Sequence, residues 1–333
     1  MDTRCGGPSV GKSSRPGMAE VHASSVARWR AHEGACLSAC FSHDGAYVLT
    51  GGQDRLVRLW TAREGVTPKM LQSFVGHGRS VRGVACSTDG DRVASCSAAS
   101  EARVWDVRTA RSVRALRGHV AAVHAVSFVG VDDAMAVTGS EDASVMLWDL
   151  RASSYKPVQT MRDAKDSVTC VFGWKDGVVA ASADGCVRTY DVRRGQCVVD
   201  ACGAPVSCAS FAEDGARAVA ACLDHRMVMY DRSDGLQLAT FRGHRSESVR
   251  TGCAFVAGGR HAACGSEDGR ICVWNAMSAR RGAADDGERP VLDLQAHVRG
   301  RAVCTLASHP SRPKLLSAAE DGVACIHQLS WRP

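Results

Sequence analysis

The chain has few lysines and few aromatic residues, and it has no long hydrophobic run. Only six of its 41 basic residues are lysine, and Phe, Trp and Tyr make up 5% of its 333 residues. No segment approaches the roughly 18–20 apolar residues that a membrane-spanning helix needs, and the N-terminus has no apolar signal core. The net charge of +6 is spread along the chain. We therefore expect no membrane partner, no secretion and no direct sequence-specific binding of nucleic acid.

The chain also has no C-x-x-C pair, although it contains 16 cysteines. In a long chain without a signal peptide, such cysteines are more typical of buried thiols in a reducing compartment than of a disulfide framework. Zinc is the alternative, but the spacing does not support it, so we expect no metal site. The cysteines that carry this interpretation stand singly in apolar runs: Cys86, Cys96, Cys170, Cys208, Cys264 and Cys272.

Catalytic motifs are absent with one exception. Neither G-x-S-x-G nor H-E-x-x-H occurs, so we expect no catalytic residue, no cofactor and no enzyme activity. The exception is GGPSVGKS, from Gly6 to Ser13, which matches the phosphate-binding loop G-x-x-x-x-G-K-[ST]. A working loop of this kind follows a strand and opens a helix, whose N-terminal amides bind the phosphates.

The surroundings of this motif do not supply those elements. Only five residues precede Gly6, and Pro16 and Gly17 would end a helix in its first turn. We expect residues 1–24 to be a disordered tail, and a nucleotide-binding enzyme is the disfavoured alternative. Both Met1 and Met18 are compatible with a translation start.

An internal repeat dominates the rest of the chain. Seven units end in an aromatic residue or its replacement, at intervals of 45, 43, 42, 40, 44 and 53 residues. Within a unit, short apolar runs alternate with period two between D-G, E-D and G-G turns, which is typical of antiparallel strands. Seven units of this length predict an all-β fold, a single seven-bladed propeller with four strands per blade. The unit endings are Trp60, Trp105, Trp148, Tyr190, Tyr230, Trp274 and His327.

Polar residues recur at fixed places in these units. An Asp stands six residues before the final residue in six units, with Ala99 in the second, and a His precedes five of the units. Spacing, Asp and aromatic together resemble the WD-repeat family over residues 25–330. In that family the His, the Asp, a Ser or Thr and the Trp of one blade form a buried hydrogen-bonded network. The resemblance implies that these residues are structural: His32, Asp54, Trp60, His77, Trp105, His119, Asp142, Trp148, Asp184, Asp224, His244, Asp268, Trp274, His297 and Asp321.

The two ends of the chain predict how the ring closes. The last unit supplies three strands and has no room for a fourth, while SVARWRAH, residues 25–32, precedes the first complete unit. We expect this segment to be the outer strand of the last blade, which removes an open sheet edge. The long last interval contains a Gly-, Ala- and charge-rich stretch, which we interpret as a mobile loop insertion over residues 276–289.

The resemblance also implies a docking face. In WD-repeat proteins, partners favour the side that bears the loop after Gly-His and the turn before the Asp. On this chain that face combines acidic and amide side chains with cations, which suits a mixed-charge protein partner better than a nucleic-acid backbone. The candidate residues are Gln53, Glu141, Glu267, Glu320, Arg79, Lys165, Arg245 and Arg299.

Residues 156–171 and the degenerate fourth and fifth units look like the mitogen-activated protein kinase organizer subfamily. Ala99, His327 with Gln328, and the 276–289 insertion depart from its pattern. The resemblance implies a monomeric scaffold in larger complexes of the nucleus and cytoplasm, with spliceosomal or MAP kinase cascade proteins as partners. An alternative starts from ARVWDVR and SVMLWDLR, which resemble the box that docks substrate receptors on cullin-RING ubiquitin ligases through Arg108 or Arg151.

Overall fold

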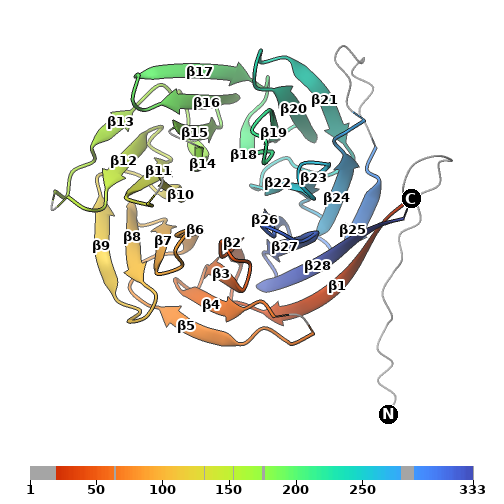
Figure 1. The fold of residues 1–333 in the computed structure, drawn as a ribbon, viewed down its shortest axis with the longest axis horizontal. Helices are drawn as coiled ribbons and strands as arrows, with labels where there is room; N and C mark the ends of the chain where they lie inside the picture. The colour runs from red at the N-terminus through yellow and green to blue at the C-terminus, as the bar shows by residue number, and fades with distance from the viewer. Residues whose placement is uncertain are drawn as a thin grey trace.

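A computed structural model describes residues 20–63, 65–130, 132–152, 154–174, 177–278 and 289–332. Over these residues the chain forms seven four-stranded antiparallel sheets, which stand around a common centre like the blades of a propeller (Figure 1). The predicted seven-bladed all-β propeller is confirmed.

Blades 1 to 6 each consist of four strands in chain order, counted from the centre of the ring outward (Figure 1). Blades 1 to 3 are formed by β2 (Cys36–Phe41), β3 (Tyr47–Gly52), β4 (Val57–Thr61) and β5 (Met70–Phe74); β6 (Val81–Cys86), β7 (Arg92–Ser97), β8 (Glu101–Asp106) and β9 (Ser112–Arg117); and β10 (Val123–Val129), β11 (Met135–Ser140), β12 (Val145–Asp149) and β13 (Gln159–Met161). Blades 4 to 6 are formed by β14 (Val168–Trp174), β15 (Gly177–Ser182), β16 (Cys186–Asp191) and β17 (Gln196–Ala201); β18 (Val206–Phe211), β19 (Arg217–Cys222), β20 (Arg226–Asp231) and β21 (Gln237–Arg242); and β22 (Cys253–Val256), β23 (His261–Gly265), β24 (Arg270–Asn275) and β25 (Leu292–Gln295).

The hydrophobic core is divided among the interfaces between neighbouring blades. Seven apolar clusters occur among the described residues, and each takes its residues mainly from two adjacent blades. Between blades 1 and 2, for example, Leu49 and Phe74 pack with Val81 and Trp105. The second and third strands of each blade are therefore covered on both faces, whereas outer strands such as β17 are largely exposed. Because every interface holds part of the core, we expect closure of the ring to contribute strongly to its stability.

Blade 7 joins the two ends of the chain. It contains β26 (Val303–Ser308), β27 (Lys314–Ala319), β28 (Val323–Arg332) and, as its outer strand, β1 (Glu20–Arg30) (Figure 1). The pairing of β1 with β28 runs antiparallel from Glu20 opposite Arg332 to Arg30 opposite Val323. Trp29 of β1 is 7% exposed and packs against Trp60 of blade 1, with 6.0 Å between ring centroids. The N-terminal strand thus closes the ring without a covalent bond.

The closing strand is longer than the sequence predicted. Residues 20–24 were expected to belong to the tail, but they are part of β1. The reason is that Val21 is buried in the apolar cluster between blades 6 and 7, together with Leu329. The indole N–H of Trp331, opposite Val21, also donates to His261 Nε2 of blade 6 (3.0 Å). The rest of the predicted tail, with the motif at residues 6–13, lies outside the described residues.

The predicted loop at residues 276–289 starts later than expected. Ala276 is 2% exposed, and its N–H donates to the carbonyl of Arg260 (2.9 Å), so this residue belongs to the core of blade 6. Residues 279–288, the greater part of the segment, lie outside the described residues, and its mobility stays a prediction.

Candidate functional site

Two blades carry the complete polar network that the repeat pattern predicts. In blade 3, His119 Nδ1 donates to Asp142 (2.9 Å), and its Nε2 accepts from the hydroxyl of Thr138 (2.8 Å), which in turn accepts from the indole N–H of Trp148 (2.9 Å). Blade 1 repeats this arrangement with distances of 2.8, 2.9 and 2.9 Å, through His32, Asp54, Thr50 and Trp60. These distances fit a neutral imidazole with its proton on Nδ1. Burial lowers the pKa of both histidines, which favours this form.

Blades 2 and 7 keep the network with substitutions. In blade 7, His297 contacts Asp321 (3.2 Å) and Ser317 (2.8 Å), and Ser317 bonds to His327 Nε2 (2.9 Å) in place of an indole. In blade 2, the Ser95 hydroxyl joins His77 (2.7 Å) to Trp105 (2.7 Å).

In blade 2 the position of the missing Asp is taken by Ala99, and the nearest carboxylate is that of Glu101. It lies 3.8 Å from His77 Nδ1 and is paired with Arg103 (2.9 Å). Glu101 was not predicted from the repeat pattern, because it stands two residues past the expected place.

Blades 4 and 5 replace the histidine by arginine. Asp184 forms an ion pair with Arg188 at 2.7 Å, and the two side chains are only 7% and 6% exposed. In blade 5, Arg226 Nε donates to Asp224 (2.6 Å). The signal that could have shown these pairs is an Arg two or four residues after the Asp in units without an upstream His.

In blade 6, the predicted hydrogen bond between His244 and Asp268 is not found. Neither ring nitrogen of His244 has a hydrogen-bond partner among the described residues. Asp268 pairs instead with Arg270 Nε (2.7 Å), and Cys264 occupies the position of the Ser or Thr. A thiol is a weak hydrogen-bonding group, and the guanidinium competes for the carboxylate. The indole N–H of Trp274 donates to the carbonyl of Arg242 (3.2 Å) rather than to a hydroxyl.

The candidate docking residues lie on one face of the ring. In every blade, the N–H of the residue before the Asp position donates to a carbonyl in the loop that leads into an inner strand, at 2.9–3.0 Å. Glu141 is joined to Ala122 in this way, and Glu267 to Arg245 (both 2.9 Å). These bonds bring the two groups of predicted residues, from the turns and from the loops, to the same end of the strands.

The side chains on this face differ in whether they form hydrogen bonds or ion pairs within the chain. Glu267 Oε1 accepts three backbone N–H groups, from residues 247, 248 and 249, at 2.7, 2.7 and 2.8 Å. Gln53 and Glu320 each accept one backbone N–H at 3.3 Å, and Arg245 pairs with Glu247 (3.3 Å). The other side chains make no hydrogen bond or ion pair with the described residues and are exposed: Arg79, Glu141, Lys165 and Arg299.

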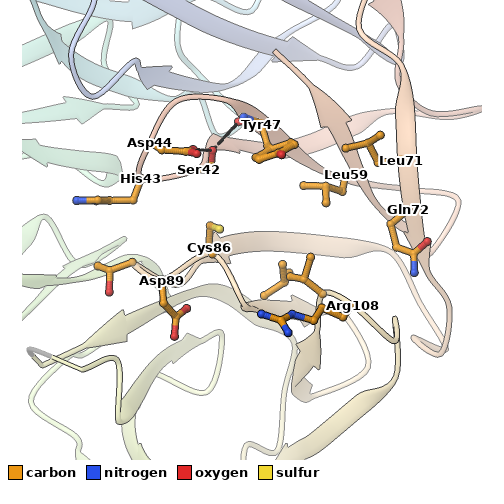
Figure 2. A pocket seen from close by; sticks show the side chains of 14 residues that line it. Ser42, His43, Asp44, Tyr47, Leu59, Leu71, Gln72, Cys86, Asp89 and Arg108 are labelled. Carbon is orange, nitrogen blue, oxygen red and sulfur yellow. Dashed lines mark hydrogen bonds between the residues drawn. The ribbon is translucent and has the colours of Figure 1, made fainter. Parts of the chain in front are cut away.

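A cavity of about 470 Å³ lies on the opposite face, between blades 1 and 2 (Figure 2). Leu59 and Val93 contribute buried apolar surface to its lining, and Leu71 is 50% exposed. Asp44 and Asp89 stand on opposite walls (Figure 2), and hydrogen bonds from Ser42 and Ser87 lower the pKa of their respective carboxyls. The sequence did not predict this cavity, because it joins hairpins from two different repeats. Chemically it could hold an apolar side chain next to a cationic group.

Comparison with known proteins agrees with this architecture. The family model described as WD domain, G-beta repeat, matches residues 23–61, 68–106, 110–149, 235–275 and 288–328. The chain belongs to the WD-repeat family. It is similar to the Homo sapiens WD repeat domain-containing protein 83, with 32% identity over 301 residues that cover 90% of this chain and 89% of that protein.

Two further WD-repeat relatives show how wide this similarity is. The Dictyostelium discoideum WD repeat domain-containing protein 83 homolog is 26% identical over 319 residues, which cover 87% of this chain and 93% of that protein. Autophagy-related protein 16 of Arabidopsis thaliana is 27% identical over 304 residues, or 90% of this chain and 56% of that protein. The WD-repeat matches leave out residues 150–234, which hold blade 4 and the first three strands of blade 5. These are the blades in which arginine replaces histidine.

The two arginines of the ubiquitin-ligase alternative lie on the surface. Arg108 and Arg151, the residues of the ubiquitin-ligase alternative, have side chains 79% and 72% exposed and pair with Asp91 (3.3 Å) and Asp149 (3.6 Å). Arg108 lines the cavity between blades 1 and 2.

Among the described residues, all cysteines are free thiols, no group of His, Cys, Asp and Glu is suited to a metal ion, and no helix could cross a membrane.

The three backbone bonds to Glu267 lead to a first prediction. Burial alone would raise the pKa of Glu267, but these N–H donors outweigh it and lower the pKa. We expect Glu267→Ala to lower the free energy of unfolding by about 1–3 kcal/mol, because three amides lose a charged acceptor. Glu141→Ala is the matched control and should change it by less than about 0.5 kcal/mol. Denaturant titration measures both; equal effects would show that Glu267 does not hold the loop.

Proposed function

We propose that this chain is a non-catalytic scaffold that holds together proteins of the spliceosome and of the MAP kinase cascade, in the nucleus and the cytoplasm. The observation that carries the proposal is the extent of the match to WD repeat domain-containing protein 83. The alignment covers about nine-tenths of both chains, so it includes the degenerate blades as well as the regular ones. These blades are also where the sequence resembles the kinase organizer subfamily.

The geometry of the docking face supports a protein partner. Four side chains on it are exposed and unengaged among the described residues, three of them cations and one a carboxylate. Their backbone is fixed by the bonds that join turn to loop, so little chain entropy is lost when a partner binds. Interleaved charges of both signs select a partner with a complementary pattern. We expect the chain to act as a monomer within larger assemblies.

The proposal predicts that reversing the charges of these side chains abolishes binding of the partner proteins. The variant combines Arg79→Glu, Lys165→Glu, Arg299→Glu and Glu141→Lys, none of which breaks a side-chain bond to the described residues. We expect roughly tenfold or greater loss of spliceosomal and kinase-cascade proteins in affinity purification with mass spectrometry, while the melting temperature stays near that of the wild type. If the same partners are captured in the same amounts, the face is not their binding site.

Substrate reception for a cullin-RING ubiquitin ligase is the second candidate, and the exposure of Arg108 and Arg151 favours it. The double variant Arg108→Ala and Arg151→Ala serves as control in the same purification, since it removes cations from the opposite face. On the scaffold proposal it keeps the spliceosomal and kinase partners. Capture of the ligase adaptor by the wild type, and its loss from this double variant, would favour the ligase role instead.

A further inference from the structure

Three basic side chains come together at the centre of the ring, where loops of the docking face lead into the inner strands. Arg82 lies on β6 and His124 at the matching position of β10 in the next blade. Arg250 precedes β22, and its Nη1 donates to the carbonyl of His124 (3.5 Å) while its Nη2 donates to that of Thr169. These contacts reach from blade 6 to blades 3 and 4, whose inner strands surround the centre (Figure 1).

Arg250 is a departure from the repeat. In the other six blades, the loop residue that bonds to the turn before the Asp position is followed directly by a fully buried apolar residue: Cys36, Val81, Val123, Val168, Val206 and Val303. In blade 6 the bonded loop residue is Arg245, and a longer loop that contains Arg250 separates it from Cys253, the first residue of β22. A guanidinium that is partly withdrawn from water lowers stability unless an anion compensates it.

Several polar atoms of this cluster form no hydrogen bond with the described residues. The Nε atoms of Arg82 and Arg250 are buried and have no hydrogen-bond partner among the described residues. The same holds for Nδ1 of His124, whose residue is 9% exposed. Neither arginine forms an ion pair with any part of the chain that the structure describes. Each of the three side chains therefore has a buried nitrogen whose hydrogen-bonding capacity the described residues do not satisfy.

The surroundings supply too little negative charge for these cations. Burial, followed by the guanidinium groups of Arg250 and Arg82, lowers the pKa of His124 to about 3. Thiols are the other ionisable groups near Arg250, and burial raises the pKa of Cys96 to about 12, so it is neutral. Hydrogen bonds from the neighbouring thiols of Cys170 and Cys253 lower the pKa of Cys208. Even as a thiolate, Cys208 would supply one negative charge against two guanidinium groups.

We propose that the centre of the ring binds a small oxyanion of the phosphate or carboxylate class. The guanidinium groups of Arg82 and Arg250 bind its oxygens, as arginine does for both classes. The imidazole of His124 presents its unused Nδ1 and donates to the same anion when that nitrogen carries the proton. The anion neutralises the charge that Arg250 brings to the inner strands, and it links blades 2, 3 and 6. This site is independent of the scaffold function proposed above.

The test compares thermal unfolding of the full chain in sodium phosphate, sulfate and acetate with unfolding in chloride of the same ionic strength. We expect phosphate to raise the melting temperature of the wild type by a few degrees (roughly 2–4 °C), because a ligand that binds only the native state stabilises it. Calorimetric titration with inorganic phosphate should show roughly tenfold weaker binding to Arg82→Gln. Arg111→Gln, which removes an exposed cation whose side chain makes no hydrogen bond or ion pair with the described residues, is the matched control and should bind like the wild type.

Arg82→Gln is chosen because Arg82 makes no hydrogen bond within the described residues, so its loss breaks no contact. In chloride this variant should melt no lower than the wild type, since it removes repulsion between two cations. A response to phosphate and sulfate assigns the site to tetrahedral anions, and a response to acetate alone assigns it to a carboxylate; both support the proposal. It is wrong if none of the three anions stabilises the wild type, or if they stabilise Arg82→Gln equally.

Discussion

A chain that lacks residues 1–32 is expected to unfold at a much lower temperature than the full chain. The deletion removes β1 and with it the outer strand of blade 7, so β28 becomes an open edge. It also removes Trp29, which fills the interface between blades 7 and 1 against Trp60, and His32, which holds Asp54. In a ring whose core is divided among its interfaces, loss of one interface weakens all the others.

The size of this effect follows from the buried side chains alone. Truncating one buried tryptophan lowers stability by about 3–5 kcal/mol, and the deletion adds Val21, the strand pairing and the His32 network. The total, at least about 5 kcal/mol, is comparable to the whole stability of many domains. We therefore expect the truncated chain to be largely unfolded or aggregated at 37 °C, as measured by calorimetry and by size-exclusion chromatography.

Two shorter deletions are the controls. Removal of residues 1–19 leaves β1 complete and should leave the melting temperature unchanged within about 1–2 °C. Removal of residues 1–22 also takes Val21 from the cluster between blades 6 and 7, so an intermediate loss is expected. The closure by β1 would be contradicted if the 1–32 deletion melted at the same temperature as the 1–19 deletion.

The fold could be predicted because the same spacing of residues recurs in seven units. Seven endings such as Trp148, with an Asp six residues before most of them, leave little choice of architecture. The missing fourth strand of the last unit pointed to an N-terminal strand. Its start at Glu20 could not be found, because residues 22–25 are polar or small, and their pairing depends on Val21 and Trp331 meeting blade 6.

The candidate site was predictable only in part. The histidines and aspartates stand at recognisable places, but the sequence does not show which pairs form, since Arg270 competes with His244 for Asp268. The arginine that crosses the centre belongs to one blade and bonds to two others, and no repeat pattern reports a contact between residues 250 and 124. The cavity between blades 1 and 2 likewise arises from packing of separate repeats.

Replacing two equivalent histidines by leucine should change the free energy of unfolding at pH 7 by clearly different amounts. His119→Leu removes one donor to Asp142, whose side chain is 6% exposed, and leaves the Thr138 hydroxyl only the carbonyl of Met146 (3.5 Å) as acceptor. We expect a loss of about 2–4 kcal/mol in the free energy of unfolding, because a buried carboxylate loses a hydrogen-bond donor. His244 is 3% exposed but has no hydrogen bond to lose among the described residues. His244→Leu should therefore change stability by about 1 kcal/mol or less at pH 7.

The pH dependence of the His244→Leu variant provides an independent measurement. Burial lowers the pKa of His244 to about 4 from its ordinary value of 6.5. In the unfolded chain His244 is protonated below about pH 6.5, whereas in the folded chain it is protonated only below about pH 4. Between these two pH values the unfolded chain binds more protons, so His244 lowers the free energy of unfolding as the pH falls. Leucine has no proton to take up, and His244→Leu should gain about 2 kcal/mol relative to the wild type between pH 7 and pH 5. Denaturant titrations at the two pH values measure this gain. Equal losses for His119→Leu and His244→Leu at pH 7, with no gain at pH 5, would mean that His244 is bonded like His119.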